Sequence, residues 1–267
     1  MTLIVKLGST FTDTSLPFLQ KDSALPGAGG VMLVDFKSVG SYAAQSAVFS
    51  SGQRFQTLVS TNTVAQSYAE ADSAGTFNAT TGALTGELDL SPVVSDPFVI
   101  DDVSHNYCFS WWFNLPTSTA NNLKLAESPA GSSRSFQMLS INSGSGLTGL
   151  NFNHWGASSN AKTTNFPYVG GSVFRMGYAW QWGGSNWQSK SVANNGTPSA
   201  WGDISGLTDS AVGLYNTDAT HPFLINFGSA TAGGSVYRVL IEDLTESGRT
   251  PEQVWDADWA RGNGRFS

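Results

Sequence analysis

Two carboxylates in this chain have the spacing that acid–base chemistry on a sugar would need. Glu87 and Asp89 are separated by one residue, so on an extended strand their side chains share a face. Glycoside hydrolases use such a pair, one group as the acid and the other as base or nucleophile. The glucanase-type pattern Glu-x-Asp-x-x-Glu, however, would need a third acid where Pro92 stands. We therefore interpret the two acids as a chance alternation on an exposed strand and expect no enzyme and no catalytic residue.

A second group of acidic residues could bind a cation. Asp96, Asp101 and Asp102, together with Asn106, offer the oxygen ligands that calcium prefers. Their spacing does not match an EF-hand, and a solvated acidic loop before a strand explains them equally well. We expect no cofactor, with calcium as the alternative.

Histidine and cysteine give no sign of a metal or nucleophile site. The single cysteine, Cys108, excludes an intramolecular disulfide and a cysteine-based zinc site, and we expect a buried thiol. The histidines are far apart, and none has a ligand partner two or four residues away: His105, His154 and His221. Structural or surface roles are expected for all three.

Aromatic residues near a glycine turn are the best candidates for carbohydrate binding. Residues 180–187 read Trp-Gln-Trp-Gly-Gly-Ser-Asn-Trp, and Trp187, in the turn, is expected to be exposed. The alternative is that these tryptophans only pack in the core, which is their commoner role in β proteins. The candidate sugar-binding residues are Trp155, Trp182, Asn186, Trp187 and Trp201.

The elements that would position these residues are strands. Residues 107–115 read Tyr-Cys-Phe-Ser-Trp-Trp-Phe-Asn-Leu, which places Tyr107, Phe109, Trp111 and Phe113 on one face. The opposite face is small or polar except for Trp112. An aromatic face of this kind needs a second apolar surface to cover it, so the segment predicts a central strand of a two-sheet sandwich.

Further segments predict one sheet-rich domain that ends in a helix. Residues 173–182 alternate well, and residues 236–244 form another strand. Thr250 then has the type of a helix N-cap, with Pro251 at the first helical position and Gln253 at the capping-box position. One short helix is expected to end near position 262.

Composition limits the class of protein. Of the 267 residues, 12% are charged and 29 are glycine, which is typical of a turn-rich β protein. The formal net charge of −7 and the lack of a Lys/Arg cluster argue against a nucleic-acid partner. No apolar run approaches transmembrane length, so no membrane insertion is expected. The first residues lack the pattern of a signal peptide, so we expect synthesis in a cytoplasm.

The first 30 residues differ in composition from the rest and predict an arm. We divide the chain into an N-terminal arm, 1–30, and a sandwich domain, 31–267. The arm has few apolar anchors, and Leu3, Val5 and Leu7 form its best short strand. Two interpretations stay open: a loop lying over its own domain, or an assembly arm that pairs with another chain.

The order of these segments resembles the concanavalin A-like lectin/glucanase superfamily in its laminin-G-like branch. Residues 109–113 look like its "F-[ST]-x-[WF]-[FV]" strand, and residues 173–182 look like a later strand of that branch. Residues 237–244 followed by 250–254 look like its closing strand and helix. The resemblance covers about residues 31–261 and implies an all-β, antiparallel jelly-roll sandwich with one short C-terminal helix.

The Gly/Ser/Ala-rich style and the N-terminal segment look like those of tailed-phage virion proteins. We therefore expect a non-enzymatic structural or decoration component of a virion, on the capsid or the tail, that assembles with copies of itself and other virion proteins as an oligomer. The alternative is an adhesion module that binds a host-surface glycan. A glycoside hydrolase of the same fold is third.

The absence of a catalytic pair generates the first test. The purified protein should release no reducing sugar from polysaccharides, because Glu87 and Asp89 lack a third acid. A reducing-end assay of the wild type beside Glu87→Gln checks this. Sugar release that the substitution abolishes would show that the protein is an enzyme.

Overall fold

The structure is a computed structural model of the 267-residue chain. The described residues are 22, 24–25, 28–59, 68–86, 88–91, 99–100, 105–118, 124–128, 136–143, 146–155, 161–168, 170–204, 215–216, 223–225 and 233–266.

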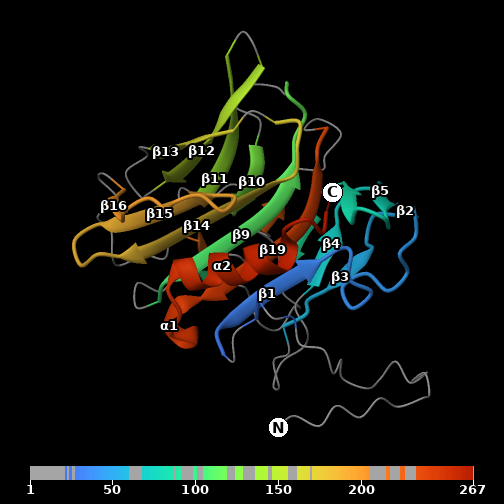
Figure 1. Cartoon of the computed structure of the whole chain (residues 1–267), viewed down its shortest axis with the longest axis horizontal. Helices are drawn as coiled ribbons and strands as arrows, with labels where there is room; N and C mark the ends of the chain where they lie inside the picture. Colours follow the sequence, from blue (N-terminus) through green and yellow to red (C-terminus); the bar gives the residue numbers. More distant parts are fainter. Residues whose placement is uncertain are drawn as a thin grey trace.

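In the described part of the chain, two antiparallel sheets face each other (Figure 1). The first sheet has nine strands, in the order β16 (Gly202–Asp203), β15 (Trp187–Ala193), β14 (Phe174–Trp182), β9 (Tyr107–Asn114), β19 (Ser235–Asp243), β6 (Ala83–Thr85), β5 (Gly75–Asn78) and β2 (Val48–Phe49), with β1 (Gly30–Asp35) also paired to β19. Its central strand β9 is the aromatic segment that the sequence singles out.

The second sheet has eight described strands. Their order is β13 (Ala161–Pro167), β12 (Gly146–Trp155), β11 (Phe136–Ser143), β10 (Lys124–Ser128), β18 (Phe223–Ile225), β7 (Leu88–Ser91), β4 (Tyr68–Ala71) and β3 (Arg54–Gln56). A small separate pair joins β8 (Val99–Ile100) to β17 (Tyr215–Asn216).

The main core lies between the two sheets. Phe109, Trp111 and Phe113 of β9 are fully buried in it, as their alternation predicts. From the opposite sheet, Phe152 stacks on Tyr178 of β14 with ring centroids 4.2 Å apart. The predicted two-sheet antiparallel sandwich is therefore confirmed.

Two helices follow the last strand. The one-turn helix α1 (Leu244–Ser247) was not predicted, and Asp243 caps it by accepting bonds from the backbone N–H groups of Thr245 and Glu246. The predicted helix is α2 (Pro251–Gly262), and its capping box between Thr250 and Gln253 is formed. None of the described helices is long and apolar enough to cross a membrane.

Helix α2 covers the outward face of the first sheet, across β9 and β14 (Figure 1). Glycines allow its close approach: a Cβ on Gly177 of β14 would lie 2.5 Å from Trp255 Nε1 of the helix. Trp255 Nε1 also donates a hydrogen bond to the carbonyl of Phe109, 3.0 Å away. Helix α2 therefore packs on the polar face of β9.

The predicted arm is described only near its end. Leu3, Val5 and Leu7 lie outside the described residues, so their pairing with another chain stays a prediction. Within the described part, Asp22 and Ala24 are buried against the sandwich. These two residues are therefore attached to the chain's own domain.

The core position of Trp111 gives the second test. Trp111→Ala should lower the free energy of unfolding by about 3–5 kcal/mol, because it removes a fully buried indole from a packed core. Urea unfolding followed by circular dichroism measures the change. Val48→Ala, at a side chain that is 68% exposed, is the control and should change little. A Trp111→Ala protein that unfolds like the parent would contradict the assigned strand face.

Candidate functional site

A continuous row of side chains crosses the outward face of the first sheet. Strand register pairs Asp35 with Arg238, Arg238 with Trp112, and Trp112 with Arg175. Asn194 extends the row, because the Arg175 backbone N–H donates to Asn194 Oδ1 at 2.9 Å. One rung of the sheet thus holds two arginines on either side of a tryptophan.

A β-bulge in β19 places Arg238 in this row. The register shifts between Val236 and Arg238 opposite β9. Val236 and Val239 both pack in the inter-sheet core, so the two residues between them face outward. Tyr237 packs with Trp112 and Phe266. An alternating strand would have turned one of these two outward residues into the core.

Asp258 of α2 joins the helix to this row. Its Oδ2 accepts hydrogen bonds from Ser110 Oγ at 2.6 Å and from Trp112 Nε1 at 2.7 Å. Its Oδ1 accepts from Arg238 Nε at 2.7 Å. Asp258, Ser110 and Arg238 are all completely buried. Because a buried charge needs partners, these bonds determine where α2 sits on the sheet.

Arg238 is surrounded by carboxylates. Its Nη1 donates to Asp35 Oδ2 at 2.8 Å and to Asp22 Oδ2 at 3.0 Å. Burial opposes its positive charge, but Asp258, Asp22 and Asp35 outweigh that effect and raise the pKa of Arg238 above its ordinary value. Burial also opposes ionisation of Asp22, yet the hydrogen bond and charge of Arg238 lower the pKa of Asp22 to about 2.

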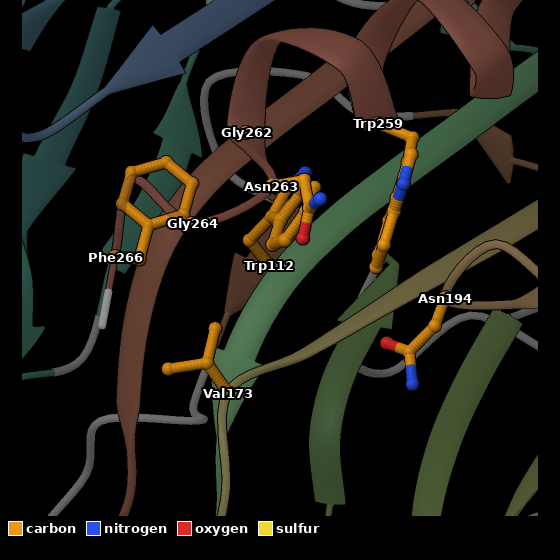
Figure 2. Close-up of a pocket in the computed structure, with 8 residues that line it drawn as sticks. All are labelled: Trp112, Val173, Asn194, Trp259, Gly262, Asn263, Gly264 and Phe266. Atoms are coloured by element: carbon orange, nitrogen blue, oxygen red, sulfur yellow. The ribbon is translucent and has the colours of Figure 1, made fainter.

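Beside this buried cluster, the C-terminal end of α2 borders an open pocket (Figure 2). The pocket has a volume of about 260 Å³. Its lining residues are Trp112, Val173, Asn194, Trp259, Gly262, Asn263, Gly264 and Phe266.

The two tryptophans of the pocket are stacked. The rings of Trp112 and Trp259 lie 5.3 Å apart between centroids and 19° from parallel. Figure 2 shows Phe266 and Asn194 on opposite sides of this pair. Trp112 and Phe266 are almost wholly buried, whereas Trp259 is half-buried and Asn263 is exposed. The accessible surface therefore combines an indole with side-chain amides.

The register of β14 and β15 explains why the predicted sugar-binding residues do not gather in one place. Trp182 and Trp187 pair directly across the hairpin, their rings 5.5 Å apart, and both face the inter-sheet core. The expectation that Trp187 is exposed is wrong, because its side chain is only 1% exposed. Trp201 packs on the other side of the sheet, with Lys190 Nζ 5.8 Å from its ring centroid. These residues therefore do not share one face.

Asn186 and Trp155 complete the predicted set. Asn186 Nδ2 donates to Asp203 Oδ2 at 3.4 Å in an exposed polar group that includes Gln188. Trp155 pairs with Ala161 at the end of β12, and its side chain lies outside the described residues. Asn186 is not among the described residues that line the α2 pocket.

The predicted calcium ligands Asp96, Asp101 and Asp102 lie outside the described residues. Asn106 is described, and its backbone N–H donates to Thr245 Oγ1 at 2.9 Å. Within the described ranges, no group of three histidine, cysteine or acidic residues could hold a metal ion.

The remaining candidates for chemistry are only partly described. Glu87 lies outside the described residues, and Asp89 is described only by its backbone pairing with Glu70 and Leu224. His105 forms a hydrogen bond with Asp243, which agrees with a structural role.

Sequence reasoning missed the α2 pocket, although two signals for it were present. Trp112 is the one large residue on the polar face of β9, and Trp255 and Trp259 lie one helical turn apart. A tryptophan on an otherwise polar strand face predicts that another element packs over that face. Helix α2 does so with its tryptophans.

Comparisons with known proteins give only distant likenesses. No family model and no curated protein matches the sequence. Domain 4 of the arabinanase AbnA from Geobacillus stearothermophilus, in complex with arabinotriose, is 11% identical with a TM-score of 0.44, covering 86% of this chain and 98% of that one. Trypanosoma rangeli sialidase with sialic acid is 8% identical with a TM-score of 0.49, covering 88% and 34%. A carbohydrate esterase from the bacteriophage phi24B is 14% identical with a TM-score of 0.40, covering 81% and 99%. At these TM-scores the likenesses carry no argument about function.

The charge cluster around Arg238 gives the third test. At neutral pH, Asp22→Asn should lower the free energy of unfolding by about 2 kcal/mol, because the folded state holds the pKa of Asp22 near 2 instead of 3.8. This contribution is fully present above pH 3.8 and is lost as the pH falls towards 2. Urea unfolding of both proteins between pH 7 and pH 2 should show the difference shrinking over that window.

The control for this test is Glu70→Gln, which removes a surface ion pair with Arg54 and should cost at most about 1 kcal/mol. A difference between Asp22→Asn and the parent that stays constant down to pH 2 would contradict the assigned ion pair.

Proposed function

We propose that this protein is a non-catalytic carbohydrate-binding sandwich and that the α2 pocket is its sugar-binding site. The observation that carries the proposal is the half-buried indole of Trp259, stacked on Trp112 and flanked by the side-chain amides of Asn194 and Asn263. Ligand sites typically combine an apolar, aromatic lining with a few placed polar groups.

The chemistry of a sugar ring matches this lining. Its C–H faces pack on an indole, and its hydroxyl groups exchange hydrogen bonds with amides, which both donate and accept. A volume of about 260 Å³ suits one ring. Because the pocket is open, the rest of an oligosaccharide would extend into solvent.

The hairpin that the sequence favoured as a sugar site has less support. Trp182 and Trp187 face the core, whereas the polar side chains of Gln181 and Gln188 form a hydrogen bond on the opposite face of the same strands. A sugar there would meet these amides on a face from which Trp182 and Trp187 point away.

The setting in which such a module works stays a prediction. A virion component that attaches to a host-surface glycan would combine the two functions that the sequence favours. The location in a virion, the self-association and the absence of enzymatic activity are untested expectations. So is the absence of a cofactor, to which bound calcium is the alternative.

The fourth test is loss of sugar binding. Trp259→Ala should weaken binding roughly 30-fold, since it removes about 2 kcal/mol of apolar contact with the ring. The probes are the methyl glycosides of glucose, galactose, N-acetylglucosamine, glucuronic acid and N-acetylneuraminic acid. Binding is measured by titration with heteronuclear NMR, where the shifts also identify the surface.

Trp201→Ala is the matched control, because Trp201 is also half-buried on the outward side but lies outside the pocket. It should leave sugar binding unchanged. Shifts that map to the β14–β15 hairpin, or no binding of any probe by the folded wild type, would refute the proposed site.

A further inference from the structure

Arg175 is a buried cation with unused hydrogen-bond donors. Its side chain belongs to the central row of the sheet and is 1% exposed. Its Nη2 donates to the backbone carbonyl of Asn194. Its Nε and Nη1 are buried and have no hydrogen-bond partner among the described residues. Such donors are rare in folded proteins, because each one loses its bonds to water without replacement.

The comparison with Arg238 shows how unusual the unpaired donors of Arg175 are. Both arginines flank Trp112 in the same rung of the sheet, and both are buried. Arg238 has three carboxylates in direct contact, whereas no ion pair joins Arg175 to a carboxylate in the described part of the chain. Burial lowers the pKa of Arg175 to about 10, against the attraction of Asp258.

The acidic residues nearest to Arg175 do not neutralise it by contact. Both oxygens of Asp258 are engaged with Ser110, Trp112 and Arg238. Asp256 acts only through its charge at a distance, and it is exposed on α2. A negatively charged group that reached the guanidinium could therefore accept hydrogen bonds from Nε and Nη1.

The guanidinium lies directly behind the wall of the α2 pocket. Its central carbon is 5.7 Å from the centre of the Trp259 ring. Trp259 and Asn194, which both contact it, line the pocket (Figure 2). Asn194 has a left-handed backbone with φ of 46°, so the wall on that side is a tight turn after β15.

We propose that the α2 pocket selects sugars that carry a carboxylate, such as a uronic or a sialic acid, and that Arg175 is the residue that recognises this group. The inference rests on the proposed sugar-binding function and names its ligand class. The sugar ring packs on Trp259, and a shift of this half-buried indole lets the carboxylate reach Nε and Nη1. The ligand then supplies the negative charge that the fold supplies to Arg238 but not to Arg175.

The test uses pairs of ligands that differ only in the charged group. Methyl β-glucuronide is compared with methyl β-glucoside, and methyl N-acetylneuraminide with its carboxyl methyl ester. The wild type should bind the acidic member of at least one pair roughly 10- to 100-fold more tightly, as expected for hydrogen bonds to a charged group. Arg175→Met should abolish this ratio and retain binding of the neutral member.

Arg54→Met is the control variant, because Arg54 lies on β3 of the other sheet, paired with Glu70. It should keep the full ratio. A second readout needs no variant. The Nε–H signal of Arg175 in wild-type protein should shift with the acidic ligand and not with its neutral partner.

The outcomes separate this inference from the proposed function. If acidic and neutral members bind the wild type equally, or if Arg175→Met keeps the ratio, the assignment of Arg175 is wrong while sugar binding stands. If no member of either pair binds the folded wild type, both proposals fail.

Discussion

The buried contact between Asp258 and Arg238 is the constraint on which the outward face of the molecule depends. A completely buried carboxylate is tolerated only with partners, and Asp258 finds them in the arginine, in Ser110 and in Trp112. Because Asp258 can meet all three in only one placement, the helix is held in one position over the sheet. Trp259, the next residue of the helix, is then stacked on Trp112, and the pocket at the end of α2 follows.

The two buried arginines in the same row of the sheet, Arg238 and Arg175, differ in the partners that surround them. Around Arg238, carboxylates from three distant parts of the chain converge, and Asp22 is 216 residues away in sequence. Around Arg175, the fold provides one backbone carbonyl and an indole. Partners offset much of the cost of burying a charge, whereas donors without partners are retained at their full cost. That cost is understandable if a ligand completes the site, which is why the less satisfied arginine points to function.

The strand faces show which side-chain orientations can be predicted from the alternation in the sequence alone. The alternation of β9 correctly predicts which of its aromatic residues enter the inter-sheet core, since successive side chains of a strand must face opposite ways. Trp187 is expected in the turn and therefore exposed, but β15 begins at this residue, and the register of the β14–β15 hairpin decides which way it faces. There Trp182 and Trp187 are direct partners and share the inward face. A shift of one residue in the turn would have turned Trp187 outward.

The sequence by itself determined the local features: the all-β class, the aromatic core face of β9, and the capping box that begins α2. Each depends on residues within a few positions of one another, whose geometry is dictated by the backbone. Only the tertiary structure decided what covers the polar face of β9, which carboxylates surround Arg238, and that Arg175 is left without one. The physical reason is that these contacts join strands and a helix distant in sequence. Their meeting depends on strand order and on a bulge in β19, which no local pattern specifies.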